Sequence, residues 1–164
     1  MPVSEIHHVA MIVSDLERSA AFYERALGYR RTLAAPVGGE GLARSLGLPA
    51  GTSGRIQYLQ GPSQLGQLEL IEWDGDAGAQ PRRSHRDLGP LLLSFQVGVE
   101  EIGDLHARFV ELGADCIEPP MRLRLDNYGY IHAFAARDPD GNLLEFVALP
   151  SREDVEAFRR EADR

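Results

Sequence analysis

Apolar and polar residues follow two different periods along this chain. Short alternating stretches predict strands, whereas Leu16 to Leu27 carries apolar residues at the 3.6-residue spacing of a one-sided helix. Ser14 and Asp15 supply a cap in front of this helix, and Gly28 ends it. A second helix is predicted for residues 99–112. Strands are predicted for residues 6–13, 29–34, 55–59, 66–73, 91–97, 131–136 and 142–149.

The segments between these elements differ in composition. Residues 36–54 are rich in Gly, Pro and Ala and contain a short helical patch over 41–48, which is typical of an insertion that lines a pocket. Residues 74–89 are polar and are predicted to be a linker, and residues 121–130 a long connection. Ser151 is expected to cap a final helix in a C-terminal tail, residues 150–164.

The order strand, helix, three strands occurs twice. The segment from Val13 to Gly28 is almost as long as that from Val97 to Gly113, which supports an internal repeat. The first module covers about residues 5–73 and the second about 90–149, and we expect both to form one domain, residues 1–149.

Two carboxylates occupy equivalent positions in this repeat. The turn Asp138-Pro139-Asp140-Gly141 precedes a strand whose alternation places Glu145 on one face among apolar residues. A carboxylate there is costly to bury unless it is paired, protonated or bound to a metal. Glu69 holds the same position in the first half. Both are therefore candidate functional residues.

Composition narrows the classes of partner. The net charge of −8 argues against binding to nucleic acid or to an anionic membrane, since both favour basic surfaces. No apolar run approaches the ~20 residues of a membrane span. Residues 1–5 show neither the basic nor the apolar region of an export signal, so export is not expected. A single cysteine excludes an intrachain disulfide. A cytoplasmic protein that handles small molecules is the expectation.

Three motifs in this order resemble the vicinal oxygen chelate superfamily. They are His8-Val-Ala-Met-Ile-Val-Ser-Asp-Leu-Glu-Arg-Ser, Leu68-Glu69-Leu70 and Asp138-Pro-Asp-Gly-Asn-Leu-Leu-Glu145. The superfamily includes glyoxalase I, methylmalonyl-CoA epimerase, extradiol dioxygenases, and bleomycin- and fosfomycin-resistance proteins. The resemblance implies an α+β fold of two tandem βαβββ modules that form a curved, cupped mixed sheet, and a homodimer.

The resemblance also implies a metal site. Metal-dependent members take ligands from the first and last strand of each module, which correspond here to His8, Glu69, Leu92 and Glu145. Leucine cannot bind a metal, so His8, Glu69 and Glu145 remain. This set suits Zn²⁺, Ni²⁺, Mn²⁺, Fe²⁺ or Mg²⁺. The alternative is a metal-free pocket in which these groups and Leu92 contact an organic ligand.

Further residues border the cavity in relatives. Arg122, Arg124 and Tyr128 lie in the corresponding loop, where an arginine can bind a carboxylate or phosphate of the substrate. A solvated loop is the alternative. Asp126 and Ala135 stand where dioxygenases need Tyr and His, so oxygenase chemistry is not expected.

Two functions stay open at this point. One is a glyoxalase- or epimerase-like lyase or isomerase, in which Glu145 or Glu69 moves a proton on a small carbonyl compound with the help of the metal. The other is a metal-free protein that sequesters a hydrophobic natural product or antibiotic, which Leu92 favours because it makes a former ligand position apolar.

Overall fold

The computed structural model describes residues 6–63, 66–75, 86, 88–126 and 128–162. The chain divides into two compact units, Met1–Pro81 and Arg82–Arg164, and each is described by itself. Most of the predicted linker, residues 76–85 and 87, lies outside the described residues. In the part of the chain that is described, no helix is both long and apolar enough to cross a membrane.

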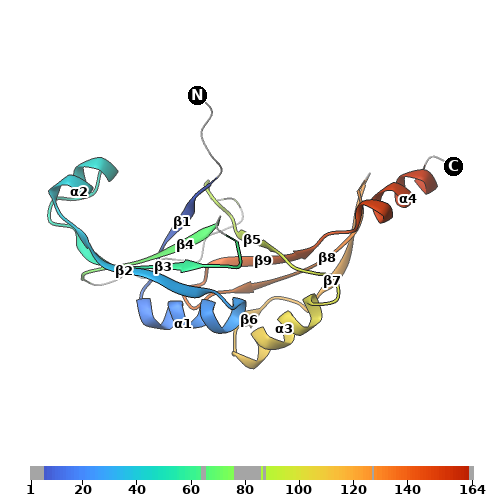
Figure 1. Cartoon of the computed structure of the whole chain (residues 1–164), viewed down its shortest axis with the longest axis horizontal. Helices are drawn as coiled ribbons and strands as arrows, with labels where there is room; N and C mark the ends of the chain where they lie inside the picture. Colours follow the sequence, from blue (N-terminus) through green and yellow to red (C-terminus); the bar gives the residue numbers. More distant parts are fainter. Residues whose placement is uncertain (1–5, 64–65, 76–85, 87, 127, 163–164) are drawn as a thin grey trace. The chain divides into compact units, whose positions relative to one another are not determined.

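Unit 1 is a four-stranded mixed sheet with one long helix on one face (Figure 1). The strands lie in the order β1-β4-β3-β2, and only β1 and β4 run parallel. The elements are β1 (His8–Ile12), α1 (Leu16–Leu27), β2 (Arg30–Gly38), α2 (Glu40–Leu46), β3 (Ser53–Gln60) and β4 (Gln67–Trp73).

The core of unit 1 lies between α1 and the sheet. The predicted cap is confirmed, because the Asp15 side chain accepts a hydrogen bond from the amide of Arg18 and Gly28 ends the helix with φ 68°. Tyr23 of α1 is fully buried and donates a hydrogen bond to Met11 Sδ at 3.8 Å. Leu59 and Leu70 are buried on the same face of the sheet. We call the other face of this sheet the open face of unit 1.

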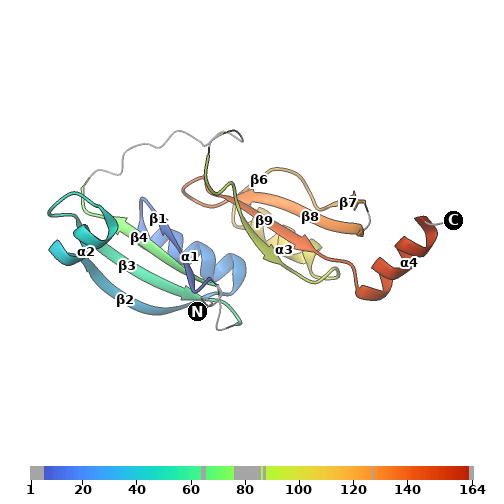
Figure 2. The same ribbon diagram turned by 90° about the horizontal axis from the view of Figure 1, so that it is seen from above.

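Unit 2 repeats this plan with one additional strand (Figure 2). Its sheet has the order β5-β9-β8-β6, β7 also pairs with β8, and only β5 and β9 run parallel. The elements are β5 (Leu93–Gln96), α3 (Ile102–Glu111), β6 (Asp115–Cys116), β7 (Met121–Leu125), β8 (Gly129–Arg137), β9 (Leu143–Ala148) and α4 (Arg152–Ala162).

Aromatic side chains form the core of unit 2. Phe109 of α3 lies with its ring 4.8 Å from that of Phe146 and 5.9 Å from that of Phe134, measured between centroids. Phe95 stacks on Phe146 from β5. This side is the helix face of unit 2, and the side that carries Glu145 is its open face, because neighbouring residues of a strand point to opposite sides.

The α+β fold class with a short C-terminal helix is confirmed, and the helical patch in residues 36–54 is α2. The prediction of a connection over residues 121–130 was wrong, because these residues form β7 and the start of β8. Met121, Leu123 and Leu125 alternate there with Arg122 and Arg124, and all five side chains are exposed. This alternation was the signal of a strand at the margin of the sheet.

Candidate functional site

A histidine and a carboxylate meet on the open face of unit 1. The Nε2 atom of His8 lies 3.2 Å from Oε2 of Glu69, and their side chains are 35% and 13% exposed. β1 and β4 run parallel with Ala10 opposite Glu69, so His8 precedes this partner by two residues and lies on the same face. The predicted residues His8 and Glu69 are therefore brought together.

Two more rings surround this pair. Tyr58 lies opposite Glu69 on β3, with its ring centroid 5.5 Å from that of His8. Burial raises the pKa of the Tyr58 phenol, and the charge of Glu69 and a hydrogen bond to it raise this pKa further. On the other side, Nδ1 of His7 lies 2.9 Å from Nδ1 of His8. Both ring nitrogens of His8 are thus engaged.

In unit 2, Glu145 contacts a serine on the neighbouring strand. Ser94 of β5 donates a hydrogen bond from Oγ to Oε2 of Glu145 at 2.7 Å. Ala135 lies opposite Glu145 on β8. The predicted turn is present, because Gly141 has φ 85° and its amide bonds to the carbonyl of Asp138 at 3.0 Å. This turn sets the start of the strand that carries Glu145.

The strand pairing supports the internal repeat. Ala10 is the register partner of Glu69 and Ser94 is that of Glu145, so the two glutamates hold equivalent places in their sheets. Leu92 precedes Ser94 by two residues, as His8 precedes Ala10. Leu92 is half-buried. The position equivalent to the His8 imidazole is therefore apolar in unit 2.

The predicted substrate-binding arginines lie elsewhere in unit 2. In the antiparallel pairing of β7 with β8, Arg122 lies opposite His132 and Arg124 lies opposite Tyr130. This register places both arginines on the helix face, whereas Glu145 is on the open face. Tyr128 is half-buried in the turn that joins β7 to β8. The strand register does not bring either arginine together with Glu145.

The three residues predicted as metal ligands belong to two different units. His8 and Glu69 belong to unit 1 and Glu145 to unit 2. Within either unit, the described residues bring together no three His, Cys, Asp or Glu side chains that could hold a metal ion. Unit 1 therefore carries two candidate donors beside Tyr58, and unit 2 carries one carboxylate beside Ser94.

Sequence reasoning missed Tyr58 and Ser94 as site residues. The antiparallel pairing of β3 with β4 places Tyr58 on the open face, opposite Glu69. Ser94 was available from alternation alone, since it lies two residues after Leu92 and therefore on the same face.

The chain matches a known family model. The model of the Glyoxalase/Bleomycin resistance protein/Dioxygenase superfamily matches residues 5–146. No curated protein sequence matches the chain.

Several solved structures share this fold. A glyoxalase family protein from Bacillus cereus has a TM-score of 0.71 and 20% sequence identity, over 92% of this chain and 97% of its own. A glyoxylase/bleomycin resistance protein/dioxygenase domain from Frankia sp. EAN1pec has a TM-score of 0.65 and 25% identity, over 91% and 100%. A single-residue mutant of the fosfomycin resistance protein FosX from Listeria monocytogenes, crystallised with Mn(II) and 1S,2S-dihydroxypropylphosphonic acid, has a TM-score of 0.62 and 20% identity, over 93% and 97%.

Proposed function

Because the chain belongs to the Glyoxalase/Bleomycin resistance protein/Dioxygenase superfamily, we propose that it is a glyoxalase- or epimerase-like enzyme that moves a proton on a small carbonyl compound. His8, Glu69 and Glu145 are proposed to hold a divalent metal ion, and Glu145 or Glu69 to act as the base. The observation that carries the proposal is the contact of His8 Nε2 with Glu69 Oε2 at 3.2 Å on the open face of unit 1.

The His8–Glu69 pair fits a divalent ion. Two ligands that each lie about 2.1 Å from a metal at a right angle are about 3.0 Å apart, close to the separation of these atoms. Metal binding through Nε2 requires the proton of His8 to sit on Nδ1, where the ring nitrogen of His7 is 2.9 Å away and can accept it. A bound divalent ion would polarise the substrate oxygens and acidify the neighbouring C–H.

Glu145 is the first choice for the base. The hydroxyl of Ser94 donates a hydrogen bond to Oε2 of Glu145. The other oxygen, Oε1, is therefore proposed to accept the substrate proton. The same carboxylate then returns the proton as an acid. The neighbour on β8 is Ala135, which offers no proton of its own. Glu69, which lies against His8, is the second choice.

Metal binding is the first measurement. We expect Mn²⁺, Ni²⁺ or Zn²⁺, added to metal-depleted protein, to raise the melting temperature, since an ion at 100 times its Kd stabilises by about 2.7 kcal/mol. Glu69→Gln should abolish most of this shift. Glu72→Gln is the matched control, because Glu72 lies on the same strand but faces the helix and pairs with Arg55. No metal-induced shift in the wild type would refute the metal role.

Proton exchange is the second measurement. We expect deuterium from D₂O to enter the reacting carbon of the methylglyoxal–glutathione hemithioacetal or of methylmalonyl-CoA in the presence of metal. Glu145→Gln should lower the exchange rate by at least 100-fold, in line with the typical contribution of a general base. Ser94→Ala should lower it less, because it removes only the hydrogen bond that orients Glu145.

The alternative is a metal-free protein that sequesters a hydrophobic compound. Leu92 favours it, because an apolar side chain occupies the position equivalent to His8. On the open face of unit 1, Ile12 is also apolar and 66% exposed. This function predicts that a hydrophobic ligand raises the melting temperature without turnover and that Glu145→Gln leaves its affinity unchanged. The homodimer implied by the family is tested separately by light scattering.

A further inference from the structure

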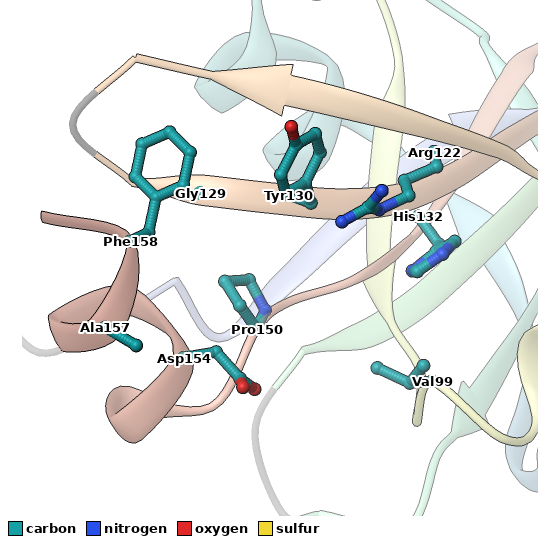
Figure 3. Close-up of a pocket in the computed structure, with 9 residues that line it drawn as sticks. All are labelled: Val99, Arg122, Gly129, Tyr130, His132, Pro150, Asp154, Ala157 and Phe158. Carbon is teal, nitrogen blue, oxygen red and sulfur yellow. The ribbon is translucent and has the colours of Figure 1, made fainter. Parts of the chain in front are cut away.

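Unit 2 contains a pocket that the proposed function does not use (Figure 3). Its volume is about 330 Å³, at the lower end of the roughly 300–1,000 Å³ of small-molecule pockets. It lies where α4 meets the pairing of β7 with β8. The lining residues are Val99, Arg122, Gly129, Tyr130, His132, Pro150, Asp154, Ala157 and Phe158.

This pocket and Glu145 are on opposite faces of the sheet. His132 lies opposite Ala148 in the β8–β9 pairing, whereas Glu145 lies opposite Ala135. His132 and Ala135 are an odd number of residues apart on β8, so they point to opposite faces of the sheet. Arg122 is the register partner of His132 on β7 and shares its face. A ligand in this pocket therefore binds without contact to the Glu145 carboxylate.

Arg122 is held in place by an aromatic ring. Its guanidinium carbon lies 3.5 Å from the centroid of the Tyr130 ring, and that ring packs edge-on against Phe158 of α4. Stacking occupies the flat side of a guanidinium and leaves its N–H edge available for an anion in the same plane. Among the described residues, Arg122 makes no ion pair. The neighbouring Arg124 does not line the pocket: it lies 3.7 Å from Asp126, and its guanidinium carbon is 5.3 Å from the centroid of the Phe158 ring.

The other side chains of the pocket define the rest of the ligand. His132 is half-buried beside Arg122 and offers a second polar group (Figure 3). Val99, Pro150 and Phe158 provide apolar walls. Asp154 accepts hydrogen bonds from the amide and hydroxyl of Ser151 at 3.2 and 2.7 Å. Its carboxylate therefore binds groups at the start of α4. Because Asp154 lines the pocket, its negative charge repels a phosphate dianion more strongly than a monoanion.

We propose that this pocket is a second binding site, for a small apolar molecule with one carboxylate group. The Arg122 guanidinium, oriented by Tyr130, binds the carboxylate with its N–H edge. The apolar body of the molecule packs between Phe158 and Pro150. The site is independent of the proton-transfer chemistry proposed above and stands even if that function is wrong.

Benzoate is the probe for this site. We expect benzoate, titrated into isotope-labelled full-length protein, to shift the amide resonances of Gly129, Tyr130 and His132 with saturation. Benzyl alcohol, which has no charge, and inorganic phosphate should bind at least tenfold more weakly. Equal binding of benzyl alcohol or of phosphate would overturn the assignment of a monocarboxylate, and shifts confined to residues around Glu145 would overturn the location.

Two arginine variants test the anchor. Arg122→Gln should weaken benzoate binding at least tenfold, whereas Arg124→Gln should leave it within twofold. Arg124 is the matched control because it lies two residues along the same strand and face but does not line the pocket. Arg122→Lys keeps the charge without the planar edge and should bind between Arg122→Gln and the wild type. Unchanged benzoate affinity in a folded Arg122→Gln variant would refute the proposal.

Discussion

The side chain of Asp138 holds the turn before β9 in its shape. It is 5% exposed, and its Oδ1 atom accepts the amides of Asp140 at 3.0 Å and of Asn142 at 2.8 Å. Its Oδ2 atom accepts the side-chain amide of Asn142 at 2.9 Å. Replacing Asp138 with Asn keeps an oxygen for the two backbone amides but sets its NH₂ group against the NH₂ group of Asn142.

The size of the effect follows from these bonds. Asp138→Asn loses one hydrogen bond to a charged acceptor, worth roughly 1.5–3 kcal/mol, so we expect the free energy of unfolding to fall by about 2 kcal/mol. Asp138→Ala loses these three bonds and should cost about 3–4 kcal/mol, since neighbouring bonds do not add fully. In an Asn142→Ala background the clash partner is absent, and Asp138→Asn should cost less than about 1 kcal/mol there.

Urea unfolding followed by far-ultraviolet circular dichroism measures these differences in a double-mutant cycle. The single variants, the double variant and the wild type are compared at one pH. A cost of Asp138→Asn that is the same with and without the Asn142 amide would refute the reasoning. So would an Asn variant that is less stable than the Ala variant.

Three further changes test other parts of the fold. Glu72→Gln should cost about 1 kcal/mol at pH 7, because this carboxylate accepts the Leu16 amide at the start of α1 and pairs with Arg55. The Leu16 hydrogen bond and then the Arg55 bond lower the pKa of Glu72 below its ordinary 4.5, so its stabilisation is fully present above pH 4.5 and is lost as the pH falls below it. The urea midpoints of the wild type and of Glu72→Gln should therefore converge as the pH falls below 4.5. A difference between the two midpoints that grows in acid would contradict this. Gly54→Ala should lower stability by more than 2 kcal/mol in thermal unfolding, because a Cβ there would overlap the carbonyl oxygen of Glu72, and a neutral effect would show that β3 and β4 can separate. Phe146→Ala should cost about 3–5 kcal/mol, because this fully buried ring contacts three other rings, and a cost below 1 kcal/mol would contradict the packing.

Much of the fold follows from local signals in the sequence. The α1 boundaries, set by Asp15 and Gly28, were predictable because a cap and a left-handed glycine act within one turn. The turn at Asp138 was predictable for the same reason. β7 was missed because exposed arginines in an alternating segment resemble a polar connection until the register with β8 is known.

The candidate site depends on pairings between distant strands. The repeat indicates which residues are equivalent, and so Glu69 and Glu145 could be predicted from the sequence. Cross-strand neighbours could not, because Tyr58 reaches Glu69 only through the antiparallel register of β3 and β4. The face of Arg122 likewise depends on a strand that composition did not reveal.

The parallel pairing of first and last strands has a consequence for folding. Among the strands that the structure describes, β1 has β4 as its single neighbour and β5 has β9. During synthesis, β1, which carries His8, therefore cannot pair until β4, which carries Glu69, has been made. The two strands are far apart in the sequence, so their pairing forms slowly. The His8–Glu69 contact forms only when the sheet of unit 1 is completed, so a chain that ends before β4 cannot bring the histidine and the carboxylate together.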